Sequence, residues 1–194
     1  MRIEVTEEKA ANLEDYARIP MSLEVRVILD LSMVQNGLGG LTLTKRKLQI
    51  PYVKDYDAIE SPRHWDKSFD LSNWSFFAAH SDGLRVGGAA MAFNTPGVTR
   101  LEDRRDVAVL WDIRVAPEAR GKGVGTALFE AVEAWSTAKG CRRLKIETQN
   151  INVPACLFYA KQGCVLGAIH RFAYPEFPNE VQMLWYKELK TETG

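Results

Sequence analysis

A glycine-rich run between an apolar stretch and an amphipathic stretch is the part of this sequence best suited to binding a ligand. Residues 120–125 read Arg-Gly-Lys-Gly-Val-Gly and follow the apolar segment 107–115. After them, Val124, Leu128 and Val132 recur at helical spacing. Glycines at the start of a helix let backbone N–H groups approach an anion closely, and the helix dipole adds about half a positive charge. The run therefore predicts a pyrophosphate-binding turn.

Three nucleotide-binding patterns compete for this turn. A P-loop requires Ser or Thr after its lysine, but Gly123 follows Lys122. A Rossmann motif requires Gly-x-Gly-x-x-Gly early in a βαβ unit, whereas this run lies well past the middle of the chain. The third pattern, Arg/Gln-x-x-Gly-x-Gly/Ala, is filled by Arg120, Gly123 and Gly125. A glycine-rich turn without a ligand is the alternative, because short glycine motifs often match by chance.

A second motif follows the turn. Residues 143–148 alternate like a strand, and Pro154 fits the first turn of a helix, where a missing N–H has no cost. Residues 152–164 read Asn-x-x-Ala-x-x-x-Tyr-x-Lys-x-Gly-Cys, which places the alanine and Tyr159 on one helical face. Gly163 predicts a left-handed cap at the end of this helix.

Both motifs resemble acetyl-CoA-binding sequences of the GNAT N-acetyltransferase superfamily. The first is similar to its pyrophosphate loop. The second is similar to its Asn-x-x-Ala-x-x-x-Tyr-x-x-x-Gly-Phe signature, with Cys164 where Phe is usual. The resemblance implies acetyl-CoA as the cofactor and a mixed α/β (α+β) fold, with a central, mostly antiparallel sheet flanked by helices. The residues that it implies in cofactor binding are Ile113, Arg114, Val115, Arg120, Gly121, Lys122, Gly123, Val124, Gly125, Thr126 and Asn152.

Acetyl transfer to an amine requires a proton for the leaving thiolate and a base for the amine. The resemblance implies that Tyr159 donates the proton; the alternative is a core tyrosine whose hydroxyl caps a backbone group. Asp112 is the candidate base, because it lies on the strand expected to line the site. Strand alternation points the Asp112 side chain to the opposite face of the sheet from its apolar neighbours, unless a bulge changes the alternation. An ion pair between Asp112 and Arg114 is an equal alternative to the role of a base. Glu147, His170 and a water chain are weaker candidates.

A narrower resemblance concerns the acceptor amine. Residues 111–115, 147–150 and 185–186 are similar to streptothricin acetyltransferases, in which the acceptor is the β-lysine amine of the antibiotic. A cationic acceptor should meet carboxylates and aromatic faces. The residues expected to bind it, against the alternative of a solvated surface, are Asp55, Asp57, Glu60, Trp65, Tyr174 and Glu180. A protein or peptide N-acetyltransferase and a non-catalytic acyl-CoA sensor are the other functions considered.

Periodicity predicts the elements that position these residues. Strands are expected at 23–31, 41–50, 74–80, 85–94, 107–115, 143–148, 164–172 and 181–187, and helices from about 124 to 139 and from 152 to 162. Residues 51–69 are expected to form short helices or a loop, and 95–106 a charged loop. Strands followed by a β-α-β-α run and a final hairpin indicate a mixed sheet. The GNAT-like core should span about 74–189, with the atypical residues 1–73 facing the substrate.

Composition sets outer limits on the function. The 194 residues favour a single domain over 1–194, and 25 basic against 25 acidic residues give no field that would attract nucleic acid or an anionic membrane. The expected partner is a small-molecule amine, with a homodimer left open. The three histidines lie far apart, which predicts no metal site. The first residues do not resemble a signal peptide, and three cysteines without a C-x-x-C motif favour the cytoplasm.

Overall fold

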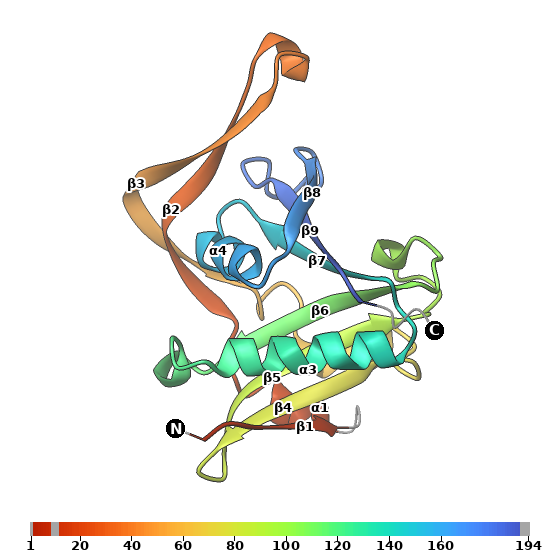
Figure 1. The fold of residues 1–194 in the computed structure, drawn as a ribbon. Coiled ribbons are helices and arrows are strands. Elements are labelled where there is room, and N and C mark those ends of the chain that lie inside the picture. Colours follow the sequence, from red (N-terminus) through yellow and green to blue (C-terminus); the bar gives the residue numbers. More distant parts are fainter. Residues whose placement is uncertain (1, 9–11, 191–194) are drawn as a thin grey trace. The chain divides into compact units, whose positions relative to one another are not determined.

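The strands of the chain form a mixed sheet and a separate two-stranded ribbon (Figure 1). The computed structural model describes residues 2–8 and 12–190. In this part of the chain the seven-stranded sheet has the order β1-β4-β5-β6-β7-β9-β8, and β2 pairs with β3. The pairs β1–β4, β4–β5 and β5–β6 are antiparallel, and β6–β7 is parallel. The mostly antiparallel sheet flanked by helices that the sequence predicts is thus confirmed.

The elements have the following bounds. The strands are β1 (Glu4–Glu8), β2 (Ser22–Met33), β3 (Leu41–Asp55), β4 (Ser75–Ser81), β5 (Leu84–Phe93), β6 (Val107–Val115), β7 (Arg143–Gln149), β8 (Val165–His170) and β9 (Gln182–Glu188). The α-helices are α1 (Leu13–Tyr16), α2 (Trp65–Ser68), α3 (Val124–Ala138) and α4 (Val153–Lys161). Short 3₁₀ helices are η2 (Gln35–Gly37), η3 (Pro62–His64), η4 (Thr99–Leu101) and η5 (Pro117–Ala119). In this described part, no helix is both long and apolar enough to span a bilayer.

The sequence prediction failed mainly in the front half of the chain. It placed a loop or short helices from residue 51, but β3 continues through Pro51 to Asp55. The register of the ribbon explains how a proline is accommodated there. Val25 pairs with Tyr52 and Val27 with Lys47, so Pro51 lies in a large bulge and need not donate a ladder hydrogen bond. The edge strand β1 and the four-residue helix α1 were not predicted, because neither is long enough to show a clear apolar period.

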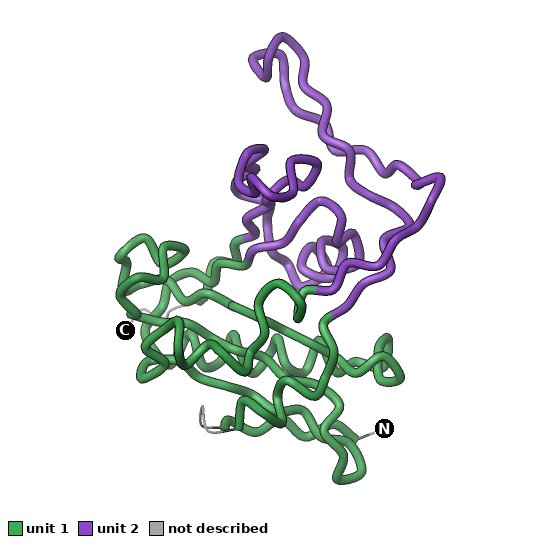
Figure 2. The backbone as a smooth tube through the Cα atoms, turned by 180° about the vertical axis from the view of Figure 1, so that it is seen from behind, with its two compact units in different colours: residues 1–21, 56–146, 186–194 green, residues 22–55, 147–185 purple. Residues whose placement is uncertain are grey.

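The chain divides into two compact units, drawn in different colours in Figure 2. Unit 1 consists of residues 1–21, 56–146 and 186–194, and unit 2 consists of residues 22–55 and 147–185. The boundaries between them fall within β7 and β9 and at the two ends of the β2–β3 ribbon.

In unit 1, helix α3 packs against the sheet strands β4, β5 and β6 (Figure 1). Gly87 of β5 makes this close approach feasible, since a Cβ there would lie 2.7 Å from Val124 Cγ1 and 3.0 Å from Leu128 Cδ1. At the adjacent Gly88, a Cβ would lie 2.6 Å from the ring of Tyr16. Neighbouring residues of a strand face opposite sides of the sheet. The two glycines therefore let α3 and Tyr16 approach β5 from opposite faces.

The face of unit 1 that holds Tyr16 is built from aromatic side chains. Tyr16, Trp65, Trp74 and Phe76 are buried together, with ring centroids 5.7–6.4 Å apart in the contacts among them. Trp111 of β6 is partly buried against this cluster, 5.2 Å from Trp74. Stacked, tilted and edge-on ring pairs of this kind stabilise a core beyond the area that they bury.

In unit 2, Asn150 joins the β2–β3 ribbon to the segment that leads into β9. Its side-chain amide donates to the Leu29 carbonyl at 3.0 Å, and its side-chain oxygen accepts from the Val181 N–H at 2.8 Å. Its backbone adds hydrogen bonds to the same two residues, at 2.9 and 3.0 Å. A small apolar cluster of Val25, Ile28 and Ile151 packs beside it. One buried asparagine thus fixes the spacing between two walls of this unit.

Candidate functional site

The glycine-rich turn in unit 1 lies where the sequence predicts it, between β6 and α3. Gly121 and Gly123 have φ values of 74° and 91°, a left-handed conformation that suits glycine. Gly123 is the N-cap of α3, and its carbonyl accepts the first helical hydrogen bond from the Ala127 N–H at 3.0 Å. The N–H groups of the first helical turn have no carbonyl partner earlier in the helix. Residues 120–123 are exposed, so an anion can reach this end of α3.

The end of β6 leads directly into this turn. The antiparallel ladder with β5 extends to Val115, whereas the last pair with β7 that the described residues form is Leu110 with Ile146. The segment 111–115 therefore has its ladder partner on the β5 side. The Arg120 Nε donates to the Val115 carbonyl at 3.2 Å, so the arginine side chain bends back over the strand end. Strand and turn together offer backbone groups to an extended ligand and to its phosphates.

Asp112 is held in a buried polar network of unit 1. Its Oδ1 accepts from the Tyr16 hydroxyl at 2.5 Å and from Arg114 Nε at 2.9 Å, while its Oδ2 accepts from Arg114 Nη2 at 2.7 Å. The guanidinium also donates from Nη1 to the Ile19 carbonyl at 2.8 Å and to Asp57 Oδ1 at 3.1 Å. Asp57 Oδ2 accepts from the Met21 N–H at 2.8 Å. The ion pair with Arg114, the alternative raised from sequence, is present in the structure.

The pKa shifts within this network follow from burial and charge. Burial raises the pKa of the Tyr16 phenol well above its usual value, and the Asp112 carboxylate adds to the shift. Burial alone would lower the pKa of Arg114, but Asp112 and Asp57 outweigh it, and the guanidinium stays charged. Ala90 of β5 pairs with Asp112 of β6, and Met91 pairs with Leu110, so Trp111 is an extra residue in β6. This is the bulge that would change the alternation of side chains along the strand.

Tyr159 lies on α4 in unit 2. Asn152 caps this helix, because its side-chain oxygen accepts from the Ala155 N–H at 3.2 Å. Gly163 has a φ of 80° and ends the helix as the left-handed residue that the sequence predicts. Tyr159 is 4% exposed, and its ring meets Phe158 edge-on with centroids 5.3 Å apart. The motif therefore forms one capped helix that holds the tyrosine in a largely buried position.

Glu147 and Tyr174 belong to a second polar network in unit 2. The Tyr174 hydroxyl donates to Glu147 Oε1 at 2.8 Å, and Gln182 Nε2 donates to Glu147 Oε2 at 2.8 Å. Gln149 Nε2 donates in turn to the Tyr174 oxygen at 3.0 Å. Both oxygens of this carboxylate thus accept from neutral donors, whereas both oxygens of Asp112 accept from a cation.

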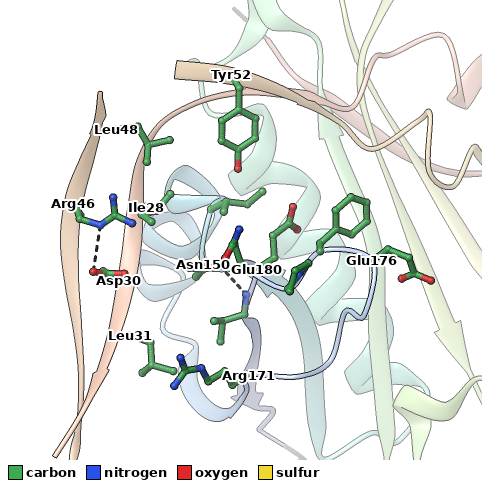
Figure 3. Close-up of a pocket in the computed structure, with 15 residues that line it drawn as sticks. Ile28, Asp30, Leu31, Arg46, Leu48, Tyr52, Asn150, Arg171, Glu176 and Glu180 are labelled. Atoms are coloured by element: carbon green, nitrogen blue, oxygen red, sulfur yellow. Dashed lines mark hydrogen bonds and ion pairs between the residues drawn. The ribbon is translucent and has the colours of Figure 1, made fainter. Parts of the chain in front are cut away.

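A pocket of about 700 Å³ lies within unit 2, between the β2–β3 ribbon and the segment 171–181 (Figure 3). Its volume is that of a small-molecule site. The apolar part of its wall is formed by Ile28, Leu31, Leu48, Ile151, Phe177, Pro178 and Val181, and the charged part by Asp30, Arg46, Arg171, Glu176 and Glu180. In Figure 3 the Tyr52 hydroxyl points into this space. Partial burial and the nearby Glu180 carboxylate raise the pKa of the Tyr52 phenol above its usual value.

Two of the pocket's carboxylates are already paired with cations of the chain. Asp30 Oδ2 accepts from Arg46 Nε at 3.2 Å, an exposed contact. Glu180 Oε1 lies 2.6 Å from Lys54 Nζ, and both of these residues are 8% exposed. The Lys54 ammonium also lies 3.3 Å from the centroid of the Phe177 ring.

The residues expected to bind the acceptor are divided between the two units. Asp57, Glu60 and Trp65 belong to unit 1, and Asp55, Tyr174 and Glu180 belong to unit 2. Those of unit 1 have structural contacts: Asp57 holds Arg114, Trp65 is 2% exposed in the aromatic core, and the Glu60 carboxylate accepts from Trp111 Nε1 at 3.2 Å. Glu180 is the member of this set that lines the pocket.

Sequence reasoning missed Asn150 and Phe177, which line the pocket, and Lys54, which pairs with Glu180 of its wall. Lys54 is two residues beyond Tyr52, so strand alternation places both on one face once β3 is extended past Pro51. No sequence signal links Lys54 to Glu180, which lies far along the chain.

Comparison with known proteins identifies the family. Residues 45–164 match the acetyltransferase (GNAT) family. Streptothricin acetyltransferase A of Bacillus subtilis is 32% identical over 155 residues, covering 76% of this chain and 80% of that protein. Streptothricin acetyltransferase of Escherichia coli is 42% identical over 84 residues, covering 42% of this chain and 48% of that protein.

Solved structures share the fold. The crystal structure of nourseothricin acetyltransferase has a TM-score of 0.75 at 21% identity and covers 98% of this chain and 100% of that one. A Bacillus anthracis structure in complex with acetyl coenzyme A has a TM-score of 0.76 at 24% identity, with the same coverage. These matches agree with the glycine turn at the N-terminus of α3 and with the capped helix that carries Tyr159. The chain therefore belongs to the GNAT acetyltransferase family and is an acetyl-CoA-dependent N-acetyltransferase.

Proposed function

We propose that this enzyme acetylates a primary amine of a cationic small molecule of the streptothricin type. The observation that carries the proposal is the pocket in unit 2, which combines an apolar wall with Tyr52, two arginines and three carboxylates, of which Asp30 and Glu180 are paired with cations of the chain. An amphipathic, amine-bearing molecule fits such a lining. The 32% identical relative from Bacillus subtilis, a streptothricin acetyltransferase, supports the same acceptor class.

The cofactor residues are proposed from the geometry of unit 1 and the capped helix of unit 2. Backbone N–H groups of the turn would hold the pyrophosphate at the N-terminus of α3, with Lys122 as an exposed cation beside it. Backbone groups of Ile113 and Val115 would pair with the pantetheine arm as an added strand. The amide nitrogen of Asn152 is the donor through which this residue would meet the arm, because its oxygen caps α4.

Acetyl-CoA, when bound, supplies an activated acetyl thioester. We propose that Tyr159 holds the proton that the departing thiolate requires, as a general acid. A largely buried tyrosine on a capped helix keeps one orientation, which favours proton donation at a fixed atom. Cys141 and Cys156 are not suited to an acyl-enzyme step, because burial raises the pKa of both thiols, that of Cys141 to about 11. Transfer is therefore proposed to go directly to the amine.

Two carboxylates compete for the role of general base. Asp112 could accept a proton only by weakening its bonds to Arg114 and Tyr16, which gives it a positioning role in this network. Glu147 accepts hydrogen bonds from the neutral donors Tyr174 and Gln182. Asp112 would give up charge-assisted hydrogen bonds from the Arg114 fork to act as a base, so we favour Glu147 for this role.

The acceptor class is tested by incubating the enzyme with acetyl-CoA and either streptothricin or a lysine-containing peptide. Mass spectrometry should show a singly acetylated antibiotic and little acetylated peptide. Aminoglycosides and polyamines serve as competing small-molecule acceptors. Robust acetylation of the peptide without the antibiotic would instead indicate a protein acetyltransferase, and binding of acetyl-CoA without any turnover would indicate a sensor.

A further inference from the structure

A carboxylate and an aromatic ring form a cation site in the wall of the pocket. Glu180 Oε1 and the face of Phe177 converge on the same point, and both residues line the pocket. A carboxylate beside an aromatic face is the chemistry that recognises an alkylammonium ion. The chain's own Lys54 fills this site, with its ammonium 2.6 Å from the carboxylate and 3.3 Å from the ring centroid.

We propose that Lys54 is a specificity-determining residue, whose ammonium occupies the Glu180–Phe177 cation site and so excludes a second ammonium group of the acceptor from this part of the pocket. The inference rests on the proposed function, because it assumes that the acceptor enters the pocket of unit 2. It adds a selection rule: the acceptor's other cationic groups must lie away from Glu180.

Burial makes Lys54 hard to displace. Lys54 and Glu180 are both 8% exposed, so removing the lysine from its partner would leave a charge with little access to water. Lys54 is also tethered by β3, whereas an acceptor must pay the entropy of association to reach the same point. A free alkylammonium ion therefore competes poorly with it.

The charges that remain at the pocket wall agree with this rule. The Asp30 carboxylate is paired with Arg46, and Glu180 with Lys54. Glu176 and Arg171 are exposed at the same wall. With Lys54 in place, the carboxylates of Asp30 and Glu180 are each neutralised by a cation of the chain. Glu176 is then the pocket carboxylate best suited to an additional cation of the acceptor.

The test compares alkyl diamines with monoamines of the same chain length, from 1,3-diaminopropane to 1,6-diaminohexane. Lys54→Met keeps an unbranched apolar stem and removes the ammonium. The ratio of kcat/KM for the best diamine to that for its monoamine should rise by about tenfold or more, since a new buried contact with a charged group becomes available. Lys54→Arg, which keeps a cation, should leave the ratio near the wild-type value.

A double variant shows whether Glu180 is responsible. In Lys54→Met with Glu180→Gln the diamine preference should return to the wild-type ratio, because the carboxylate is gone. An unchanged ratio in the folded Lys54→Met variant would overturn the proposal, and so would a preference that survives in the double variant.

Calorimetric titration of the same amines without acetyl-CoA separates this proposal from the proposed function. Tighter diamine binding by Lys54→Met without any acetyl transfer would support the cation site and count against the acceptor assignment. Acetyl transfer with unchanged diamine affinity would support the acceptor assignment and count against the cation site. Should Lys54→Met be too unstable to assay, diamines should raise its melting temperature more than that of the double variant; equal responses would overturn the proposal.

Discussion

At the scale of single residues, the partners of each side chain decide which chemistry it can perform. Arg114 is 3% exposed and lies two residues from Asp112 on the same strand, so its fork can close on both carboxylate oxygens. The sequence allowed this ion pair, but it did not show whether Asp112 is paired with Arg114 or acts as a general base. The third member, Tyr16, lies in a helix too short to be predicted, and nothing in the sequence marks it as a donor to Asp112.

Tyr159 is the residue on which the proposed chemistry depends most. Tyr159→Phe removes the hydroxyl and keeps the ring that packs on Phe158. We expect kcat to fall by about 10²–10⁴, because a general acid contributes on that order, while affinity for acetyl-CoA should be nearly unchanged. Steady-state kinetics and calorimetry of the same preparation measure both quantities.

A matched control is available in Tyr186→Phe, which makes the same chemical change on a half-buried tyrosine of β9 in unit 1. This variant should turn over at the wild-type rate. Equal turnover by the wild type and Tyr159→Phe would leave Tyr159 as a packing residue.

At the scale of elements, the residues of unit 1 that adjoin β2 and β3 in the chain are joined to one another by hydrogen bonds that no local pattern reveals. The Tyr56 N–H donates to the Met21 carbonyl at 2.9 Å, directly beside the two strand ends. Asp57 then accepts from Met21 and Arg114. Alternation was sufficient to predict β2 and most of β3 from the sequence. The extension of β3 past Pro51 was not predictable, because a bulge that accommodates a proline depends on the register of the partner strand.

The network that joins α1 to β6 predicts a pH dependence of stability. The folded state holds the Tyr16 proton to a higher pH than the unfolded chain, whose phenol has a pKa of about 10. Above that pH the unfolded state binds fewer protons, so the free energy of unfolding should fall as pH rises.

Tyr16→Phe removes this contribution. Above about pH 10, its unfolding free energy should fall less steeply than that of the wild type, by up to about 1.4 kcal/mol per pH unit. Urea denaturation between neutral and alkaline pH measures the two slopes. Parallel curves for the two proteins would show that Tyr16 titrates in the folded state as it does in the unfolded chain.

At the scale of the whole molecule, the two motifs predicted the family and the fold, whereas the pocket of unit 2 was not predictable. The motifs are local: each is a strand, a turn and a helix whose residues are close in sequence. The pocket is assembled from residues 28–52 and 150–181, and its lining depends on pairs such as Lys54 with Glu180 that form across that distance.

Calorimetric titration of acetyl-CoA into the wild type and Gly123→Asp tests the central claim, that the turn before α3 binds the cofactor. The aspartate adds bulk and negative charge where the phosphates are proposed to lie, so binding should fall below detection. Gly97→Asp is the matched control, because Gly97 also has a positive φ, 83°, and open space around its Cβ position. It should bind acetyl-CoA as the wild type does. No binding by the wild type, or equal binding by Gly123→Asp, would contradict the account.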